Sequence, residues 1–371
     1  MSTMPTRAAD MGRGRHGTTP ISPAHCPATE ERRSDRRPRQ PAGPDAGETN
    51  REPDRLHVRM AATIAAAVAA SLLDELETWP KPGLVSHVDA GSHTDMDAGT
   101  FRRSVAAIEP FYAALVTAGA SRAEMDELRR IGLDAERAML AATNGVNTHR
   151  GAIFGLGLLC AAAGAALSSD APRPWSGTRW TCAARVLGAI VRQRWGRAIL
   201  AGPIPIGSHG TNALRRFGAG GARAQAAGGF RLALQVGLPA LQRGRRLAPG
   251  DALAARVQAF FALLLVADDT NLLHRGGMAG LAYARTAASS FLAAGGVGRP
   301  GWVEAAVAVH RAFVTRRLSP GGCGDLLAAT LFLDRLEIGL NPDDTQAHPS
   351  PGTVTSPDVT AALASKRMSG D

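Results

Sequence analysis

The chain has 371 residues, of which 45% are hydrophobic and 20% charged, so it is long enough to bury a large core in one or two domains. The formal net charge of +10 suggests an anionic partner, but 11 of the 42 Lys and Arg residues precede Met60. Aromatic residues are only 5% and do not interleave with arginine, as a single-stranded nucleic-acid surface requires. We therefore expect no nucleic-acid partner and a small anionic ligand.

The cysteines and the apolar runs indicate the cellular compartment in which we expect the protein. Cys26, Cys160, Cys182 and Cys323 are widely separated and form no CxxC pair, so the sequence indicates neither a zinc site nor a disulfide framework. The longest apolar run, residues 151–167, is shorter than the ~20 residues that span a bilayer, and we interpret it as a buried helix. With no secretory signal in residues 1–59, we expect a cytoplasmic protein without a membrane partner.

Three parts follow one another along the chain. Residues 1–59 have few large apolar side chains and no sustained periodicity, which predicts a disordered basic tail. Residues 60–340 form the catalytic domain in this interpretation, and residues 341–371 a flexible tail.

The catalytic domain is predicted to be all-α, a compact multi-helix domain with catalytic loops between Ala-rich helices. Runs rich in Ala and Leu alternate with short Gly/Pro segments, and alternating Val, Ile and Thr are scarce. Ser121 and Glu124 form a capping-box pattern ahead of one helix, whereas residues 168–179 resemble a loose connection. The predicted helices lie near residues 61–77, 100–118, 122–143, 150–167, 180–196, 222–236, 251–267, 277–294, 301–316 and 323–338.

Polar residues gather in the connections between these helices, where binding groups tend to lie. One connection holds Lys81 between two prolines, and Lys366 is the only other lysine in a chain that otherwise uses arginine. A compact ammonium there suits a phosphate, while the alternative is an exposed lysine in a rigid turn.

Two pairs of carboxylates lie in such loops, Asp95 with Asp97 and Asp268 with Asp269. Paired carboxylates beside Gly and His suit Mg²⁺ that also binds substrate phosphates, and either pair could instead supply a general base. The alternative is that these acids are helix N-caps.

Four histidines, His93, His149, His209 and His274, also lie in these loops. Their spacing does not favour zinc, so we predict hydrogen bonds to phosphate or to a leaving base, with a structural role as the alternative. Arg150 and Arg275 each follow one of these histidines and precede a glycine, which suits phosphate binding.

Two glycine-rich segments are ambiguous. Residues 207–230 offer flexible backbone N–H groups for an anion or form a plain loop, and they lack the G-K-[ST] ending of a P-loop. In residues 319–325 the ordinary role for Asp325 is helix capping.

Five ordered motifs within residues 70–338 resemble the triphosphoribosyl-dephospho-CoA synthase family, which prepares the prosthetic group of malonate decarboxylase and citrate lyase. They are Pro-Lys-Pro-Gly-Leu-Val at 80–85, Gly-Ser-His-Thr-Asp-Met-Asp at 91–97, Gly-Val-Asn-Thr-His at 145–149, Asp-Asp-Thr-Asn-Leu-Leu-His-Arg-Gly-Gly at 268–277 and Ser-Pro-Gly-Gly at 319–322.

The resemblance implies transfer of the 5-triphosphoribosyl group of ATP to the 2′-hydroxyl of 3′-dephospho-CoA, with Mg²⁺ present and adenine released. It also implies two later partners, a phosphoribosyl-dephospho-CoA transferase and the acyl-carrier subunit. On this basis Lys81, Arg150 and Arg275 contact phosphates, one Asp pair binds metal and the other supplies the base, and a histidine lies near the departing adenine. The expected catalytic residues are Asp95, Asp97, Asp268, Asp269, His93 and His274, with both Asp pairs as metal ligands, and the expected nucleotide-binding residues are Lys81, Asn147, His149, Arg150, His209, Arg275, Gly276 and Gly277.

The chain departs from the family pattern at two places. Arg150 stands where the family often has lysine, and Cys323 and Gly324 stand where it tends to have Ser and Ala. The segment 207–230 is more similar to the malonate decarboxylase branch than to the citrate lyase branch.

Two other functions use the same residues. A Mg²⁺-dependent hydrolase of N-glycosidic bonds would need the same carboxylates and phosphate ligands, with water as the acceptor. A non-catalytic carrier of a CoA-like nucleotide would bind without turnover.

Overall fold

The computed structural model describes residues 51–168, 175–176, 179–203 and 209–342, and the side chains from residue 55 onward except those of residues 175, 176 and 209. These residues confirm the all-α fold, since the only strands among them form one short hairpin. The elements are α1 (Arg51–Leu76), α2 (Ala98–Ala120), α3 (Met125–Ala142), α4 (Arg150–Leu167), β1 (Trp175–Ser176), β2 (Arg179–Trp180), α5 (Ala184–Ala201), α6 (His209–Phe217), α7 (Gly221–Ala227), the π-helical turn η1 (Ala233–Gly237), α8 (Leu238–Leu247), α9 (Ala252–Val266), α10 (Thr270–Ala293), the 3₁₀ turn η2 (Gly296–Gly298), α11 (Trp302–Thr315) and α12 (Gly321–Ile338).

Two helix starts differ from the prediction. Helix α1 begins at Arg51, ahead of the expected boundary at residue 60. Ser121 is the C-cap of α2, and α3 begins at Met125 after Glu124, which makes no side-chain cap bond, so the predicted capping box was wrong. The structure instead forms a capping box at the start of α2, between Asp97 and Thr100.

The region around residues 175–247 also differs from the prediction. The expected helix 222–236 is broken after Ala227, where Gly228 and Gly229 begin a turn and Gly229 has φ of +78°. The chain then continues through η1 into α8, which the sequence patterns did not indicate, as they did not indicate α6 or the hairpin. Helices α6 and α7 are short, and such short runs give little periodicity to detect.

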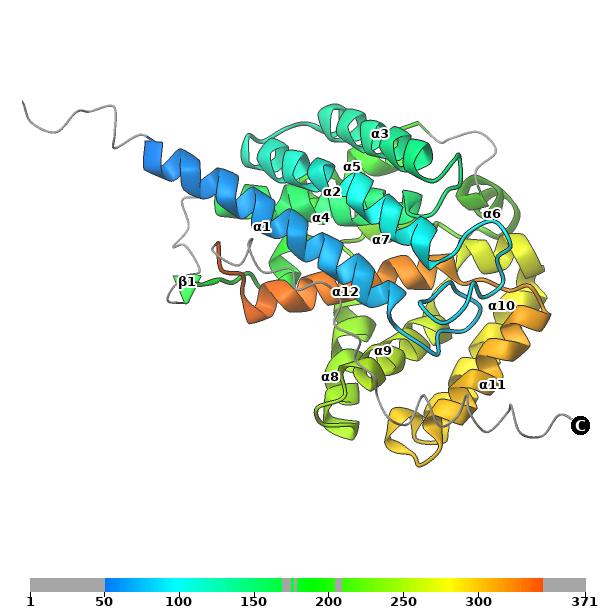
Figure 1. Ribbon diagram of the computed structural model, residues 1–371. Helices are drawn as coiled ribbons and strands as arrows, with labels where there is room; N and C mark the ends of the chain where they lie inside the picture. The colour runs from blue at the N-terminus through cyan, green and yellow to red at the C-terminus, as the bar shows by residue number, and fades with distance from the viewer. Residues whose placement is uncertain (1–50, 169–174, 177–178, 204–208, 343–371) are drawn as a thin grey trace, which may run out of the picture. The chain divides into compact units, whose positions relative to one another are not determined.

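Helix α12 lies between the two hydrophobic clusters of the described residues and contributes to both. Ala329 and Phe332 pack into the cluster built mainly on α1–α5, whereas Leu327 and Leu331 pack into the cluster built mainly on α8–α11. Figure 1 shows α12 running between α1 and α4 on one side and α8 and α9 on the other, all of which it contacts. The N-terminal end of α12 is therefore held by both halves of the core.

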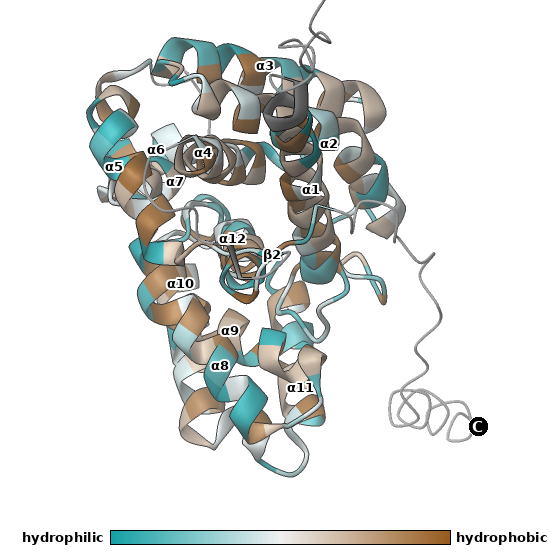
Figure 2. Cartoon of the chain, turned by 90° about the vertical axis from the view of Figure 1, so that its left-hand side faces the viewer, coloured by the Kyte–Doolittle hydropathy of each residue, from teal (hydrophilic) through white to brown (hydrophobic). Residues whose placement is uncertain are grey.

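Helix α4 is buried and apolar, as predicted for residues 151–167. It contacts α1, α2, α3, α5, α7 and α12, and in Figure 2 its ribbon carries the colours of hydrophobic residues along most of its length. By length and composition Arg55–Leu76 and Arg150–Leu167 could each cross a membrane, but 56% and 67% of these windows are buried, as in the core helices of soluble proteins.

Helices α2 and α4 approach each other closely through a reciprocal pair of glycines. A Cβ at Gly119 of α2 would lie 1.9 Å from the carbonyl oxygen of Ala161, and a Cβ at Gly164 of α4 would lie 1.9 Å from that of Val116. Two backbones can approach this closely only where no side chain intervenes. This contact fixes the position of α4, whose first turn lines the site described below.

We predict that Gly164→Ala lowers the free energy of unfolding by about 2–3 kcal/mol, because the added methyl forces the two backbones apart. Gly132→Ala on α3 is the matched control, since a Cβ there meets nothing within 4 Å. It should stabilise the protein by about 0.5–1 kcal/mol through its helix propensity. Urea unfolding followed by circular dichroism measures both, and equal effects in the two variants would contradict the close approach.

Candidate active site

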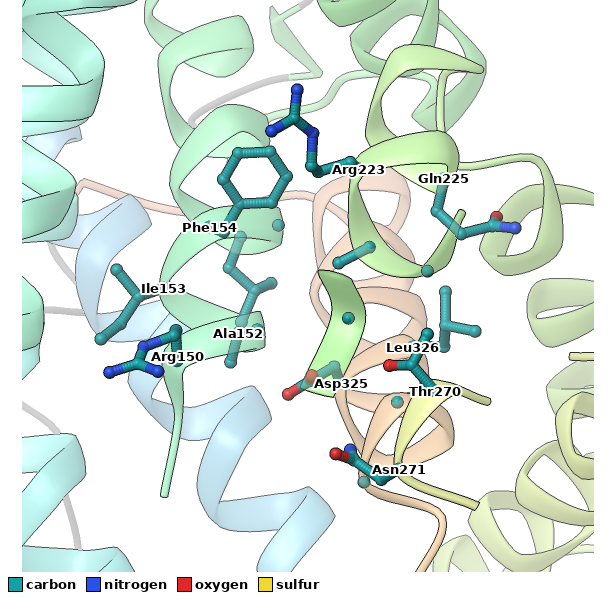
Figure 3. A pocket seen from close by; sticks show the side chains of 18 of the residues that line it. Arg150, Ala152, Ile153, Phe154, Arg223, Gln225, Thr270, Asn271, Asp325 and Leu326 are labelled. Carbon is teal, nitrogen blue, oxygen red and sulfur yellow. The ribbon is translucent and has the colours of Figure 1, made fainter. Parts of the chain in front are cut away.

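The first turns of three long helices line one cavity of about 670 Å³. Residues 150–158 of α4, 270–271 of α10 and 321–322 and 325–326 of α12 all contribute to its wall, together with residues 220–225 at the start of α7. Figure 3 shows Ala152 and Arg150 of α4 on one side of the cavity, and Asn271 and Asp325 on the other. The helix dipoles, and those N–H groups of the first turns that have no acceptor within the protein, make such a place favourable for anions.

Asp269 joins two of these helix starts. One oxygen of its carboxylate accepts the backbone N–H groups of Asn271 (2.9 Å) and Leu272 (3.0 Å) in α10, and the other accepts that of Cys323 (2.8 Å) in α12. Asp269 is buried, which raises the pKa of its carboxyl group, while the hydrogen bonds oppose this. The helix-cap alternative is thus what the structure shows for this residue.

His93 joins the loop 91–97 to the starts of α10 and α12. Its Nε2 lies 2.8 Å from Ser319 Oγ, and its Nδ1 lies 3.3 Å from Arg275 Nη2 and 3.4 Å from Asp95. Burial, followed by the charge of Arg275, lowers the pKa of His93, so the ring is neutral near pH 7. Arg275 also donates to the carbonyl oxygens of Ser92 and Arg317.

Asn147 and Arg150 lie on the cavity wall at the start of α4. Asn147 Oδ1 accepts the backbone N–H of Arg150, whose Nε donates to Glu136. His149, between them, points away from the cavity into the core, where its Nδ1 lies 2.7 Å from Ser104 Oγ. Burial, followed by the charge of Lys81, lowers the pKa of His149 to about 3, and its Nε2 has no partner among the described residues.

Lys81 is completely buried and is not on the cavity wall. Its ammonium donates to the carboxylate (2.5 Å) and to the backbone carbonyl (2.6 Å) of Glu75. Burial lowers the pKa of Lys81, and the Glu75 charge opposes that change. The rare lysine therefore forms an enclosed ion pair with α1.

Apart from His209, the other predicted residues do not line the cavity. Asp97 is exposed and caps α2, and Asp95 is exposed beside His93. His274 is exposed, while Gly276 and Gly277 form a kink within α10 at which Gly277 has φ of +58°. His209 begins α6, and its side chain lies outside the described part of the chain.

The carboxylates fit a metal ion only in part. Among the described residues, no three His, Cys, Asp or Glu side chains gather so that they could hold a metal ion. The oxygens of Asp269 are occupied by backbone N–H groups, whereas Asp268 lies on the cavity wall with a side chain that is 65% exposed and paired with Arg285 (2.7 Å). This set suits a cation that arrives with a phosphate ligand and takes one carboxylate oxygen, and it does not suit a preformed metal site.

Two residues of the cavity wall have roles that the sequence patterns did not reveal. Asp325, interpreted as a cap, points from α12 towards the first turn of α4 (Figure 3). Arg223 donates to the carbonyl oxygens of Ile199, Leu200 and Gly202 at the end of α5. This arginine of the segment 207–230, which was predicted as an anion-binding loop, thus has a structural role. The roles of Asp325 and Arg223 can be seen only in the structure, because in the sequence both residues lie in glycine-rich segments that have no distinctive pattern.

Comparison with known proteins gives a consistent result. The family model described as ATP:dephospho-CoA triphosphoribosyl transferase matches residues 61–343. No solved structure matches the chain significantly.

Three curated relatives carry the name "Probable 2-(5''-triphosphoribosyl)-3'-dephosphocoenzyme-A synthase". The one from Pseudomonas paraeruginosa is 40% identical over 278 residues, which cover 73% of this chain and 89% of the relative. One from Pseudomonas aeruginosa is 41% identical over 72% of this chain and 88% of its own length. One from Azotobacter vinelandii is 39% identical over 72% of this chain and 89% of its own length.

We predict that Asp269→Ala lowers the free energy of unfolding by about 3 kcal/mol, since three buried N–H groups lose their acceptor. Asp251→Ala is the matched control, because Asp251 caps α9 with a single bond to the Ala254 N–H. It should cost about 1 kcal/mol. Equal losses in a urea titration would show that Asp269 is only a local cap.

The buried His149 predicts a pH dependence of stability. Its folded pKa of about 3 lies below the value near 6.5 in an unfolded chain, so the unfolded state binds the proton first as the pH falls. The contribution of neutral His149 to the free energy of unfolding is therefore complete above pH 6.5 and is lost progressively as the pH falls towards 3. Between pH 6.5 and 4 the wild type should lose roughly 3 kcal/mol more than His149→Gln. Parallel pH profiles of unfolding for the two proteins would rule this out.

Proposed function

Because the chain belongs to the ATP:dephospho-CoA triphosphoribosyl transferase family, we propose that it moves the 5-triphosphoribosyl group of ATP to the 2′-hydroxyl of 3′-dephospho-CoA. The products are adenine and 2′-(5″-triphosphoribosyl)-3′-dephospho-CoA. In this reaction the bond from the ribose anomeric carbon to adenine N9 breaks, and a bond from that carbon to the acceptor oxygen forms.

The observation that supports this proposal most directly is the convergence of three helix N-termini on one cavity. A triphosphate needs several favourable groups at once, and the starts of α4, α10 and α12 direct their helix dipoles and the N–H groups not already donated to Asn147 or Asp269 at the cavity from three directions. Arg150 and Arg275 add positive charge at the wall. Lys81 is not among the proposed phosphate ligands, because its ammonium is enclosed with Glu75.

The remaining part of the cavity suits the rest of two nucleotide substrates. The whole cavity has a volume of about 670 Å³, within the range of ~300–1,000 Å³ that is typical of ligand sites. Apolar side chains also line the cavity, among them Leu128, Phe154 and Leu214. We assign contact with the departing base to neutral His93, which lies on the cavity wall, whereas His274 does not.

In this proposal Mg²⁺ binds to the protein together with ATP. Asp268 is the carboxylate that would share the ion with substrate phosphates, as Mg²⁺ is usually bound through one or two carboxylates and phosphate oxygens. The ion would neutralise phosphate charge, while the residues of the chain orient the ribose and exclude water.

The test is the dependence of adenine release on the acceptor. With ATP and Mg²⁺, we expect adenine and the triphosphoribosylated product in equal amounts when 3′-dephospho-CoA is present, and no adenine when it is absent or replaced by its 2′-deoxy analogue. Chromatography with mass spectrometry measures both products. Equal release without acceptor would identify a hydrolase, and binding without turnover would identify a carrier; either result would refute the proposal.

We further propose that the product supplies the acyl-carrier subunit of malonate decarboxylase rather than citrate lyase, in the cytoplasm, where ATP and dephospho-CoA occur. The similarity of residues 207–230 to the malonate decarboxylase branch supports this. The free, buried cysteines at 160, 182 and 323 are consistent with a reducing compartment.

This pathway assignment is tested by supplying the product, through the phosphoribosyl-dephospho-CoA transferase of each pathway, to both acyl-carrier subunits from the source organism. Loading of the citrate lyase subunit alone would contradict it.

A further inference from the structure

Four carboxylates line the cavity, and three of them already have partners. Glu136 accepts from Arg150, Asp268 pairs with Arg285, and Asp269 accepts three backbone N–H groups. Asp325 is different, since its one partner is the Ala152 backbone N–H, and no side chain among the described residues forms an ion pair or a hydrogen bond with it. It is thus the cavity carboxylate that remains available to a substrate.

The position of Asp325 is set by the start of α4. Its carboxylate points across the cavity at this helix (Figure 3), and a Cβ added at Gly151 would lie 2.0 Å from its Oδ2. Only a glycine at 151 leaves room for the carboxylate. The neighbouring Ala152 N–H favours its charged form, but this is the weaker effect.

The groups around Asp325 make its carboxylate basic. Burial is the main cause, followed by the negative charges of Glu75 on α1 and Asp269 before α10, and together they raise the pKa of Asp325 well above that of an ordinary aspartate. On the side of α2 its neighbour is Tyr112, a buried phenol whose hydroxyl has no partner among the described residues.

Neither Lys81 nor Arg150 cancels this effect. Lys81 is paired with Glu75, and Arg150, across the cavity, is paired with Glu136.

We propose that Asp325 is the catalytic base that takes the proton from the attacking 2′-hydroxyl of the acceptor. The inference rests on the function proposed above. As the acceptor oxygen forms its bond to the anomeric carbon, its proton moves to the Asp325 carboxylate. The bond from that carbon to adenine N9 breaks with its electron pair, adenine takes up a proton from solvent, and Asp325 returns its proton to solvent.

Replacement of Asp325 by Asn tests the proposal, because the amide keeps the shape but cannot accept the proton. We expect kcat for acceptor-dependent adenine release to fall by about 10²–10⁴-fold, the usual contribution of a general base. Asp251→Asn is the matched control, the same change at the start of α9, outside the cavity wall, and it should retain wild-type activity.

Stability separates a catalytic role from a structural one. Because the folded pKa of Asp325 lies above its unfolded value, the fold favours the protonated form, and the ionised carboxylate destabilises the protein as the pH rises through that pKa. At neutral pH Asp325→Asn should therefore melt at the same temperature as the wild type or higher. A lower melting temperature together with the loss of activity would indicate a structural role and overturn the proposal.

The pH profile of kcat/KM is a second measurement. In the wild type the rate should fall on the acid side through a pKa above the ordinary range of aspartate, since the base must be ionised. The acid limb should be absent from Asp325→Asn and present, at a lower rate, in Asp325→Glu. An acid limb of the same pKa in Asp325→Asn would overturn the proposal.

Gly151→Ala provides a check that does not alter the carboxylate itself. We expect a loss of rate comparable to that of Asp325→Asn, and little further loss when the two changes are combined, because both act through one group. Additive losses would show that Gly151 acts by another route. If the wild type releases adenine without acceptor, the function proposed above fails. If the wild type depends on the acceptor and Asp325→Asn keeps the wild-type rate, only the assignment of Asp325 fails.

Discussion

The site depends on one buried carboxylate that accepts N–H groups from two helices. Asp269 holds the first turns of α10 and α12 together through Asn271, Leu272 and Cys323. Helix α12 lies between both hydrophobic clusters, so its start is fixed by the whole core. Helix α4 is placed independently through its close contact with α2 at Gly119 and Gly164. The meeting of three helix starts therefore follows from core packing and one polar bridge, and the loops between them need little rigidity of their own.

This arrangement divides the acidic residues by their partners. Asp269, Asp268 and Glu136 receive several backbone N–H groups or an arginine and hold the scaffold, whereas Asp325 has only the Ala152 N–H and no side-chain partner among the described residues, and is left for chemistry. The buried Glu75–Lys81 pair lies behind α12, where a Cβ at Gly324 would approach Glu75 Oε1 to 2.9 Å. A charged pair enclosed there keeps negative potential near Asp325 without exposing a cation to the phosphates. Anion binding and proton acceptance can thus operate side by side in one cavity.

Much of the fold and part of the site could be predicted from the sequence. Long Ala-rich runs such as 150–167 have clear periodicity, and the ordered motifs indicated which loops would meet, as His93, Asp268 and Arg275 do. Local patterns could not say where a side chain points. Lys81 and His149 stand in polar loops, yet both face the core, because the neighbouring helices supply Glu75 and Ser104 as partners. The role of Asp325 was also hidden, since it depends on Gly151, which is far away in sequence.

The central claim is that the triphosphate of ATP binds where α4, α10 and α12 begin. Hydrogen–deuterium exchange of the protein with and without saturating ATP and Mg²⁺ tests it directly. The account predicts slower exchange for the backbone N–H groups in the first turns of these three helices, residues 150–153, 270–273 and 321–324, and little change in α8, α9 and α11. Protection confined to other helices, with none at these three starts, would contradict it.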